Sequence, residues 1–267
     1  MRGKVVGMVY PDELLYETAG VVHSCIQVRQ RGSVRYLRFG ASGGWQGAIR
    51  CVAGARPVFA YQRAFAALVE SRPELGRFLA LGVGTGTALR TVLQIHPTCA
   101  PEGVDIDQTV IELALQYFDA PEPGRAQYYV HDAVLFCDHA ATPYDLVFVD
   151  VYRARSLDAR ILSEAFVERL RRITVPGGAV VCNIIDRMPA TGALAEFARA
   201  ARERFGHVWV LPVGSVPSFL DQNLLWVMSD RSEDGVRWRE RMRTSHWVAP
   251  WERVIWPMRI RSADRVL

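Results

Sequence analysis

Three glycines between two apolar runs are the first residues in this chain whose spacing points to chemistry. Gly82, Gly84 and Gly86 stand in the segment LALGVGTGT, after a strand-like run and before a helix-like one. Glycine lets the backbone turn tightly and bring its N–H groups close to a ligand. A dinucleotide fingerprint, G-x-G-x-x-G, would place its third glycine at position 87, where this chain has Thr87. The spacing here is G-x-G-x-G instead.

An aspartate follows each of the next three apolar runs. Asp105 comes 19 residues after Gly86, where an acid suits a hydrogen bond to ribose hydroxyls. Asp132 follows the next run and could accept from an adenine amino group, and Asp150 ends the run after that. Ligands of open α/β sheets bind beyond the carboxyl ends of the strands, so we expect all four turns to meet in one crevice. Asp107 is expected to cap the helix that begins near residue 108.

The elements that must position these residues alternate between strand and helix. This order predicts a doubly wound, mostly parallel, seven-stranded sheet. Two strands at 208–211 and 224–228 have no helix-length segment between them and are expected as an antiparallel pair at one edge. The other expected strands are 78–81, 103–105, 127–130, 146–149 and 179–182, and the expected helices are 86–95, 108–118, 133–138, 160–173 and 190–205.

The two ends of the chain have patterns of their own. Strands expected at 21–30 and 34–39, followed by a hairpin turn at 40–44, predict a small antiparallel β unit, and a helix is expected over 57–71. The end of the chain is rich in arginine and tryptophan and is expected to pack as a helix and an extended arm on the core or on a second subunit. We therefore predict three parts: a β unit at 1–55, a nucleotide-binding α/β domain at 56–230 and a tail at 231–267.

Composition excludes several classes of protein. The chain has 267 residues, 50% of them hydrophobic and 22% charged, as globular proteins have. Charged residues and prolines interrupt every apolar run, so no membrane span is expected, and the N-terminus does not read as a signal peptide. Five scattered cysteines without a C-x-x-C pair argue against zinc and disulfides and fit a cytoplasmic protein. The net charge of +4 is too small to indicate nucleic acid, and no residue spacing suits a metal.

These motifs resemble the class I S-adenosylmethionine-dependent transferases and, more narrowly, their spermidine synthase (polyamine aminopropyltransferase) branch. The resemblance covers roughly residues 15–230. It is carried by Gly82-x-Gly84-x-Gly86, Val104-Asp105-Ile106-Asp107, His131-Asp132-Ala133, the run ending at Asp150, Pro176-Gly177-Gly178, Tyr16-Glu17, Gly44-Trp45-Gln46 and Tyr61.

The resemblance implies roles for these residues toward an adenosyl sulfonium donor. The glycine loop, with Thr85, would line the amino acid or aminopropyl part of the donor. Asp150 matches the acid thought to take a proton from an attacking amine, and Tyr152 could stabilise a sulfonium or an ammonium by a cation–π contact. The resemblance also implies Asp105 at the ribose, Asp132 and Ala133 at the adenine, Ile106 among the cofactor-binding residues, and Tyr61 and Gln46 at positions near donor and acceptor.

Departures from the branch decide between donors. Aminopropyltransferases carry G-G-D-G in the glycine loop, and that aspartate pairs with the free amine of decarboxylated S-adenosylmethionine, whereas this chain has Thr85. Losing the acid removes a charged hydrogen bond and a repulsion against the carboxylate of the intact donor. Arg63 and Arg153 stand where the branch has acids for a polyamine, so we expect a cationic acceptor to be repelled.

These observations leave three candidate functions. The first is methyl transfer from S-adenosylmethionine to a small acceptor, with Asp150 as the base. The second is aminopropyl transfer from decarboxylated S-adenosylmethionine, and the third is nucleoside binding without turnover. No nucleic acid, membrane or metal is expected as a partner, and a homodimer is expected from the β unit and the tail.

Overall fold

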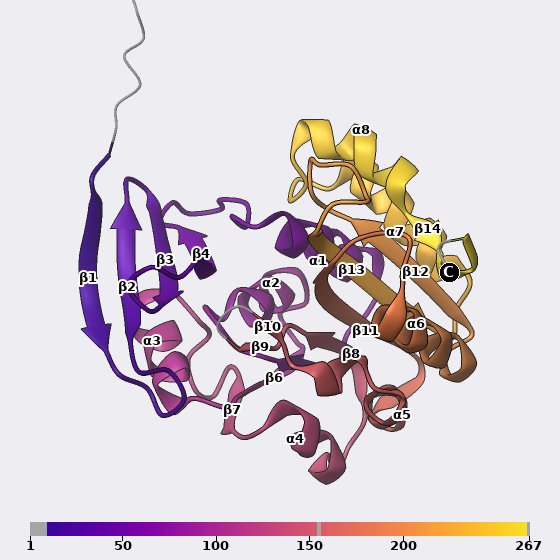
Figure 1. Cartoon of the computed structure of the whole chain (residues 1–267), viewed down its shortest axis with the longest axis horizontal. Helices are drawn as coiled ribbons and strands as arrows, with labels where there is room; N and C mark the ends of the chain where they lie inside the picture. Colours follow the sequence, from indigo (N-terminus) through magenta and orange to yellow (C-terminus); the bar gives the residue numbers. More distant parts are fainter. Residues whose placement is uncertain (1–9, 154–155, 266–267) are drawn as a thin grey trace, which may run out of the picture.

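Two β-sheets form the framework of the protein in the computed structural model, which describes residues 10–153 and 156–265. The smaller sheet is antiparallel, and its strands follow one another in chain order. It lies at one side of the molecule (Figure 1). Its strands are β1 (Asp12–Thr18), β2 (Ile26–Arg31), β3 (Val34–Phe39) and β4 (Trp45–Arg50).

The larger sheet has eight strands and carries the nucleotide motifs. Its strands are β5 (Arg77–Leu81), β6 (Ala100–Asp105), β7 (Gln127–Val130), β8 (Tyr144–Val149), β11 (Thr174–Asp186), β12 (His207–Pro212), β13 (Gln222–Ser229) and β14 (Arg261–Ser262). Their order is β14-β12-β13-β11-β8-β5-β6-β7. The five strands from β11 to β7 run parallel, and β13 and β12 are antiparallel, as the sequence predicts. The short β14 adds an eighth strand that the sequence pattern does not predict, and a separate ladder joins β9 (Tyr152–Arg153) to β10 (Ser156–Leu157).

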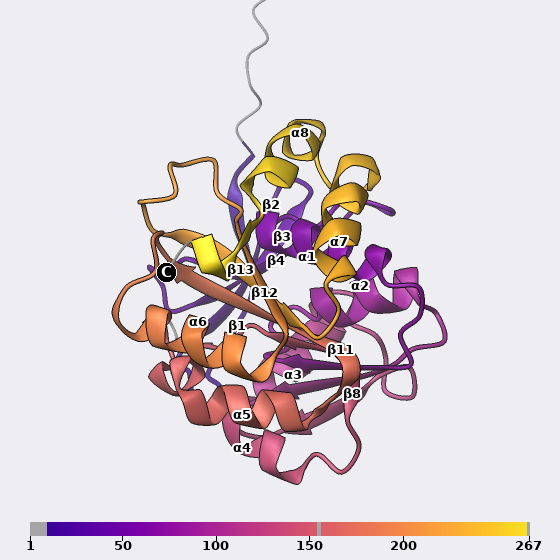
Figure 2. The same ribbon diagram turned by 90° about the vertical axis from the view of Figure 1, so that its right-hand side faces the viewer.

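Helices cover both faces of the larger sheet, so the core has three layers (Figure 2). On one face α4 (Ala133–His139), α5 (Glu164–Arg172) and α6 (Gly192–Arg204) bury their apolar sides against the strands, with the short helix η1 (Ala159–Leu162) before α5. On the other face lie α1 (Ala60–Ser71), α2 (Thr87–Ile95), α7 (Glu233–Thr244) and α8 (Pro250–Arg259). Each predicted helix of the α/β region is present, which confirms the doubly wound fold.

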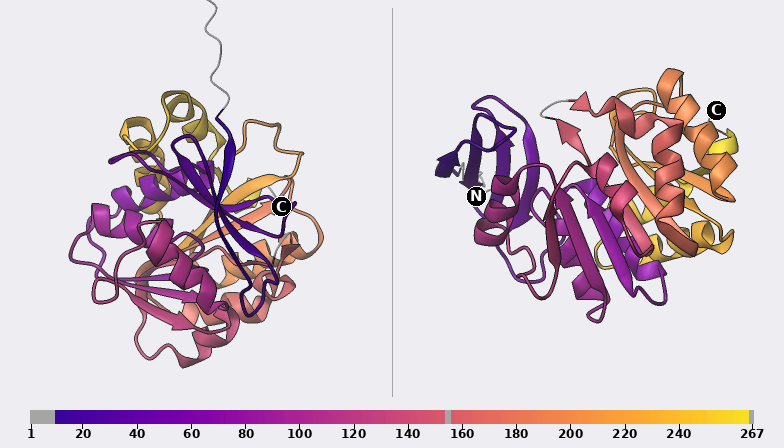
Figure 3. Two further views of the ribbon diagram at one scale, coloured as in Figure 1. Left: turned by 90° about the vertical axis from the view of Figure 1, so that its left-hand side faces the viewer. Right: turned by 90° about the horizontal axis from the view of Figure 1, so that it is seen from below.

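The smaller sheet docks on α3 (Gln108–Tyr117), which separates it from the larger sheet (Figure 3). Asp107 caps this helix through the Thr109 N–H, as predicted, and it also accepts from the N–H groups of Val21 (3.1 Å) and Val22 (3.0 Å). The prediction of a strand beginning at residue 21 is wrong, because these N–H groups bind a carboxylate and not a neighbouring strand. Strand β2 starts at Ile26. The small sheet packs on α3 and the residue after it through one buried apolar cluster: Ile26, Val28, Leu37, Ile49, Val110, Leu113 and Phe118.

The described part of the C-terminal tail packs on α1 and contains the helices α7 and α8, the short strand β14 and the short helix η2 (Ala263–Arg265), where the sequence suggested one helix and an arm. The indole of Trp238 is fully buried and donates to the Ala64 carbonyl (3.1 Å), and Arg72 pairs with Asp234 (2.9 Å). Trp256 is also fully buried. The boundaries near residues 55 and 230 between the β unit, the α/β domain and the tail remain predictions.

Candidate active site

A cavity lies beyond the carboxyl ends of β5, β6, β7 and β8, where the sequence places the four turns. Its volume is about 110 Å³. Of the predicted site residues, only Gly86 is missing from the described lining. The others that line the cavity are Gln46, Tyr61, Gly82, Gly84, Thr85, Asp105, Ile106, Asp132, Ala133, Asp150 and Tyr152.

The glycine loop has the backbone shape that glycine permits. Gly82 has φ +96°, and a Cβ there would lie 2.3 Å from the Asp150 carbonyl oxygen, so this position packs against the next turn. Gly84 (φ +54°) faces open space in the cavity. Gly86 is the left-handed N-cap of α2, and a Cβ there would meet Ala120 at 2.5 Å. The first two glycines therefore shape the cavity, whereas the third starts a helix.

Asp105 ends β6 with its carboxylate turned toward the glycine loop. It accepts from the N–H groups of Val83 (3.0 Å) and Asp107 (3.1 Å). Burial raises the pKa of Asp105, and these backbone hydrogen bonds offset part of that rise. Oδ2 also accepts from the Gly84 N–H (3.4 Å), so Oδ1, which has the single Asp107 donor, is the oxygen that keeps acceptor capacity for a ribose hydroxyl.

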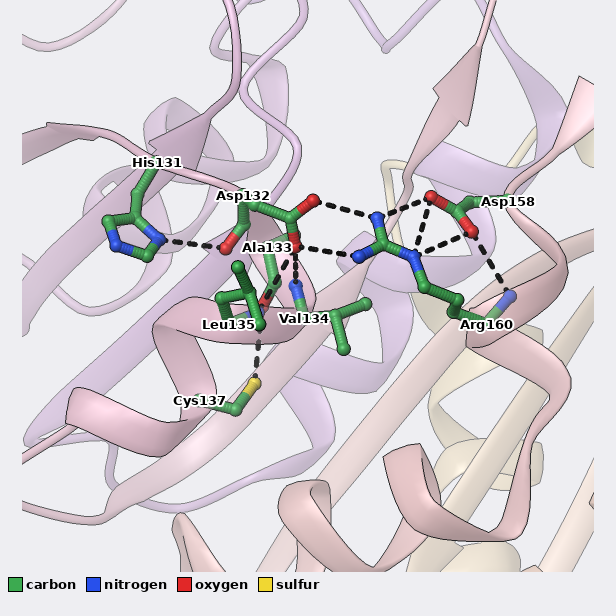
Figure 4. Close-up of polar contacts among 8 residues, drawn as sticks. All are labelled: His131, Asp132, Ala133, Val134, Leu135, Cys137, Asp158 and Arg160. Carbon is green, nitrogen blue, oxygen red and sulfur yellow. Dashed lines mark hydrogen bonds and ion pairs between the residues drawn. The ribbon is translucent and has the colours of Figure 1, made fainter.

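Asp132 is held from two sides (Figure 4). One oxygen caps α4 by accepting from the N–H groups of Val134 (2.9 Å) and Leu135 (3.1 Å), and the other accepts from the Arg160 guanidinium (2.7 Å). Arg160 also pairs with Asp158 (2.7 Å), and both of these residues line the cavity. Burial would raise the pKa of Asp132, but the Arg160 hydrogen bond and the cap hold it below its usual value. The sequence analysis did not identify Arg160, because this residue belongs to no recognised sequence motif.

Asp150 directly follows β8 and receives one neutral donor on each oxygen. The Tyr61 hydroxyl donates to Oδ2 (2.8 Å) and the Asn183 amide donates to Oδ1 (2.8 Å). Burial raises the pKa of Asp150, while the hydrogen bonds from Asn183 and Tyr61 lower it in part. Asn183 is itself oriented by Asn223, whose amide donates to its Oδ1 (2.9 Å). The sequence analysis did not identify Asn183, although a single polar amide within the apolar run AVVCNII indicates a residue with a specific hydrogen-bonding role.

Tyr152 lines the cavity, and its hydroxyl is committed to the backbone of β11. The hydroxyl donates to the Asn183 carbonyl (3.0 Å) and accepts from the Ile185 N–H (2.8 Å). Burial raises its pKa above the ordinary range, so the phenol stays neutral. A role for Tyr152 must therefore come from the ring face.

The sequence argument about Arg63 is wrong. Arg63 does not line the cavity in the structure; its Nε donates to Glu252 on α8 (2.9 Å), and Nη1 donates to the Pro57 carbonyl (2.9 Å). Successive helix residues point about 100° apart, so Tyr61 can face the cavity while Arg63 faces the tail. Its charge is balanced by Glu252 and does not repel a ligand. The side chain of Arg153 lies outside what the structure describes.

The loop before β2 and the end of β3 supply a wall that the sequence analysis did not identify. Val22, His23 and Phe39 line the cavity, and the rings of His23 and Phe39 stack at 3.7 Å between centroids. Burial lowers the pKa of His23, although Asp107 and Asp105 act in the opposite direction. Such contacts join segments far apart in the chain, so local spacing carries no sign of them.

The described residues hold neither a cluster of metal ligands nor a membrane-spanning helix. No group of three or more His, Cys, Asp or Glu side chains there is placed to hold a metal ion. Within residues 10–153 and 156–265, no helix is both long and apolar enough to cross a bilayer.

Solved structures share this architecture. A structure described as a probable spermidine synthase from Corynebacterium glutamicum ATCC 13032 has a TM-score of 0.74 at 20% identity and covers 94% of this chain and 91% of its own. A spermidine synthase in complex with the transition state analogue AdoDATO has a TM-score of 0.66 at 16% identity, covering 88% and 80%. Fold and site together define a spermidine synthase-like protein of the class I S-adenosylmethionine-dependent fold.

The sequence comparisons place the chain more narrowly. It belongs to the spermine/spermidine synthase family, because the model of the "Spermine/spermidine synthase domain" matches residues 58–233, about two thirds of its length. A "Probable polyamine aminopropyl transferase" of Bifidobacterium longum (strain NCC 2705) is 36% identical over 118 residues, 44% of this chain and 26% of the relative. A "Polyamine aminopropyltransferase" of Aeropyrum pernix is 29% identical over 171 residues, 59% and 52%. The chain thus matches about half or less of each relative's length.

Proposed function

We propose that this chain transfers the aminopropyl group of decarboxylated S-adenosylmethionine to a small amine. Family membership favours this reaction over methyl transfer, which was the first expectation from the sequence. The observation that carries the proposal is the Asp150 carboxylate, held by Tyr61 and Asn183 in the same cavity as the glycine loop and Asp105.

The environment of Asp150 suits a cationic donor and a proton transfer. Both side chains that donate to it are neutral, and no cation contributes to its pKa shift among the described residues. A sulfonium or ammonium in the cavity would therefore be attracted to an unbalanced, poorly solvated carboxylate. A raised pKa also makes the carboxylate a better proton acceptor near neutral pH.

The reaction needs only groups that the cavity supplies. The lone pair of a neutral acceptor amine attacks the propyl carbon bonded to the sulfonium, and the carbon–sulfur bond breaks with its electrons going to sulfur. The products are methylthioadenosine and a secondary ammonium, and the ammonium gives one proton to the Asp150 carboxylate. Asp105 would hold the ribose, Asp132 and Ala133 would lie at the adenine, and the Tyr61 hydroxyl would orient Asp150.

Methyl transfer from intact S-adenosylmethionine is the second candidate, because of Thr85. Its side chain is buried and its hydroxyl contacts that of Thr87 at 2.9 Å, so the glycine loop offers no carboxylate to a donor amine. The same loop presents no negative charge to repel an α-carboxylate. Calorimetry with both donors decides: tighter binding of the intact form would favour methyl transfer.

The test of the base is Asp150→Asn in the full chain. With labelled donor and a panel of amines, we expect turnover to fall by about 10²–10⁴-fold, while the affinity for the product methylthioadenosine, which carries no sulfonium charge, is retained in calorimetry. An unchanged rate would remove Asp150 from the chemistry. Tight donor binding with no product from any acceptor, in the parent chain, would favour a nucleoside-binding protein without turnover.

A further inference from the structure

A second cavity lies along the edge strand β7, on the face of the larger sheet that α4 covers. Its volume is about 820 Å³, within the range of small-molecule sites, and no described residue lines both this cavity and the active-site cavity. Its lining comes from the starts of β5, β6 and β8, from β7 and from α4. Because α4 has only seven residues, it leaves this edge of the sheet partly open.

Aromatic and apolar side chains form part of the lining. Phe136 on α4 is buried and Tyr129 on β7 is 37% exposed, and their ring centroids lie 5.1 Å apart at an interplanar angle of 45°. The Tyr129 hydroxyl donates to Gln127 Oε1 (2.7 Å), and Val130, the next residue along β7, is 53% exposed. The described chain thus leaves aromatic and apolar surface uncovered here, which suits a flat ring.

A buried carboxylate also lines the cavity, and its charge is already balanced. Glu102 is 7% exposed; its Oε1 accepts from Arg77 Nη2 (2.6 Å) and its Oε2 accepts from the Tyr144 hydroxyl (2.9 Å). The Arg77 guanidinium lies 5.0 Å from the centre of the Tyr144 ring, a cation–π contact that holds it in place. A cationic ligand would have to compete with Arg77 for Glu102, so this carboxylate does not make the cavity a cation site.

Basic groups outnumber acids in the lining. Glu102 is the one acid among the described lining residues, whereas Arg77 and Arg125 both line the cavity. Arg125 is exposed, and its Nη2 donates to the Pro97 carbonyl (3.2 Å) and not to a carboxylate. Arg77 Nε is buried without a hydrogen-bond partner among the described residues, so Glu102 does not use all the donors of this guanidinium. Unused donors with a net positive charge favour an anionic ligand.

We infer that this cavity is a second ligand site, which binds a flat aromatic anion. The ring lies against Tyr129 and Phe136, and the oxyanion is held by Arg125 and Arg77. None of these residues takes part in the proposed reaction, so the inference goes beyond the proposed function and does not depend on it. The oxyanion has two sources, an aromatic carboxylate or an aryl phosphate, and each has its own probe.

Ligand-observed NMR titrations of the full chain test the class of ligand. 2-Naphthoate and 2-naphthyl phosphate carry a flat ring and an anion, whereas 2-naphthamide carries the ring without the charge. We expect the better of the two anions to bind at least about tenfold more tightly than 2-naphthamide, because only an anion gains charged hydrogen bonds from the arginines. Binding should persist when methylthioadenosine saturates the active-site cavity. The tighter anion identifies the carboxylate or the phosphate as the source.

Variants at exposed positions locate the bound anion. Arg125→Gln should weaken the anion about tenfold and leave 2-naphthamide unchanged, and Arg125→Lys should restore part of the loss. Tyr129→Ala should weaken the anion and 2-naphthamide alike, since both lose the ring contact. Arg237→Gln, at an exposed arginine on α7, is the matched control and should change neither affinity. Thermal unfolding of each variant verifies that it folds.

Four results would overturn the assignment. Neither anion binds in the millimolar range, or the anions bind no more tightly than 2-naphthamide. Arg125→Gln has the same effect as Arg237→Gln, or methylthioadenosine displaces the probe, which would place the probe in the active-site cavity. Because none of these measurements needs turnover, a failure of the proposed reaction is distinguishable from a failure of this site.

Discussion

At the scale of single residues, the site is organised around a carboxylate with neutral neighbours. Asp150 accepts from Tyr61 on one oxygen and from Asn183 on the other, and Asn223 fixes the direction of the Asn183 amide. Burial also raises the pKa of Tyr61 well above its usual value, mainly by desolvation and secondly through the charge of Asp150. Tyr61 therefore stays a hydrogen-bond donor throughout the working pH range. The carboxylate is held in place without being neutralised.

Asn183→Leu is expected to shift the pH profile of activity. Asp150 acts as a base only when ionised, so kcat/KM falls as the pH drops through its pKa. The Asn183 hydrogen bond stabilises the ionised form and lowers that pKa; removing it raises the pKa, and the acid limb of the profile moves to higher pH. Initial rates from pH 4 to 9 measure the limb. A limb that stays in place, or moves to lower pH, would show that another group controls it.

At the scale of elements, long-range polar contacts set how the outer parts meet the α/β core. Asp107 holds the loop before β2, and Arg35 on β3 donates to the Tyr117 carbonyl at the end of α3 (2.8 Å). On the opposite side, Glu252 of α8 receives Arg63 of α1 and accepts from the Ala249 N–H (2.8 Å). Glu252 is fully buried, so this one carboxylate both starts α8 and ties the tail to α1.

Glu252→Ala is expected to lower the free energy of unfolding by about 3 kcal/mol, because it leaves the largely buried Arg63 guanidinium without its carboxylate partner. Urea unfolding followed by tryptophan fluorescence measures the change. Glu240→Ala, an exposed position on α7, is the control and should cost less than about 0.5 kcal/mol. Replacing both partners, as Arg63→Leu with Glu252→Leu, should restore part of the loss. Equal effects of Glu252→Ala and Glu240→Ala would contradict the role of this ion pair.

Features set by residues close together in the chain could be predicted from the sequence. Contacts between residues far apart in the chain could not. The glycine turn, the Asp107 cap and the acids after each strand follow from local rules, so eleven of the twelve predicted site residues line one cavity. The strand expected at residue 21 failed because its N–H groups bind Asp107, 86 residues away. The prediction that Arg63 faces the ligand was wrong because its side chain binds Glu252 of the tail. Asn183 reaches Asp150 because β11 pairs with β8, and this long-range pairing cannot be read from local sequence spacing.

At the scale of the whole molecule, the larger sheet joins two apolar layers through the same strands. Cys137 and Cys182 belong to the layer under α4, α5 and α6, while Cys99 belongs to the layer under α1, α2, α7 and α8. Alternating side chains of β5, β8 and β11 enter both layers. Loss of either layer therefore exposes the strands that support the other, and we expect the two layers to unfold together.

The cysteines offer a direct test of that expectation. Burial raises the pKa of the Cys99 and Cys137 thiols to about 12 and raises that of Cys182 as well, so at pH 8 almost no thiolate is present and access is blocked. Cys51 is exposed and Cys25 is half-buried, and both flank the small sheet. With iodoacetamide at pH 8, we expect Cys51 to react first and Cys25 more slowly, with the other three protected.

In a urea series analysed by mass spectrometry, Cys99, Cys137 and Cys182 should become reactive at one shared midpoint, since their layers lose the same strands. That midpoint should coincide with the change in tryptophan fluorescence, because Trp226 lies in the first layer and Trp238 and Trp256 in the second. If Cys99 became reactive at clearly lower urea than Cys137 and Cys182, the layer under α1, α2 and the tail would open on its own. The tail would then be a separately unfolding unit, and the ion pair between Arg63 and Glu252 would stabilise that unit alone.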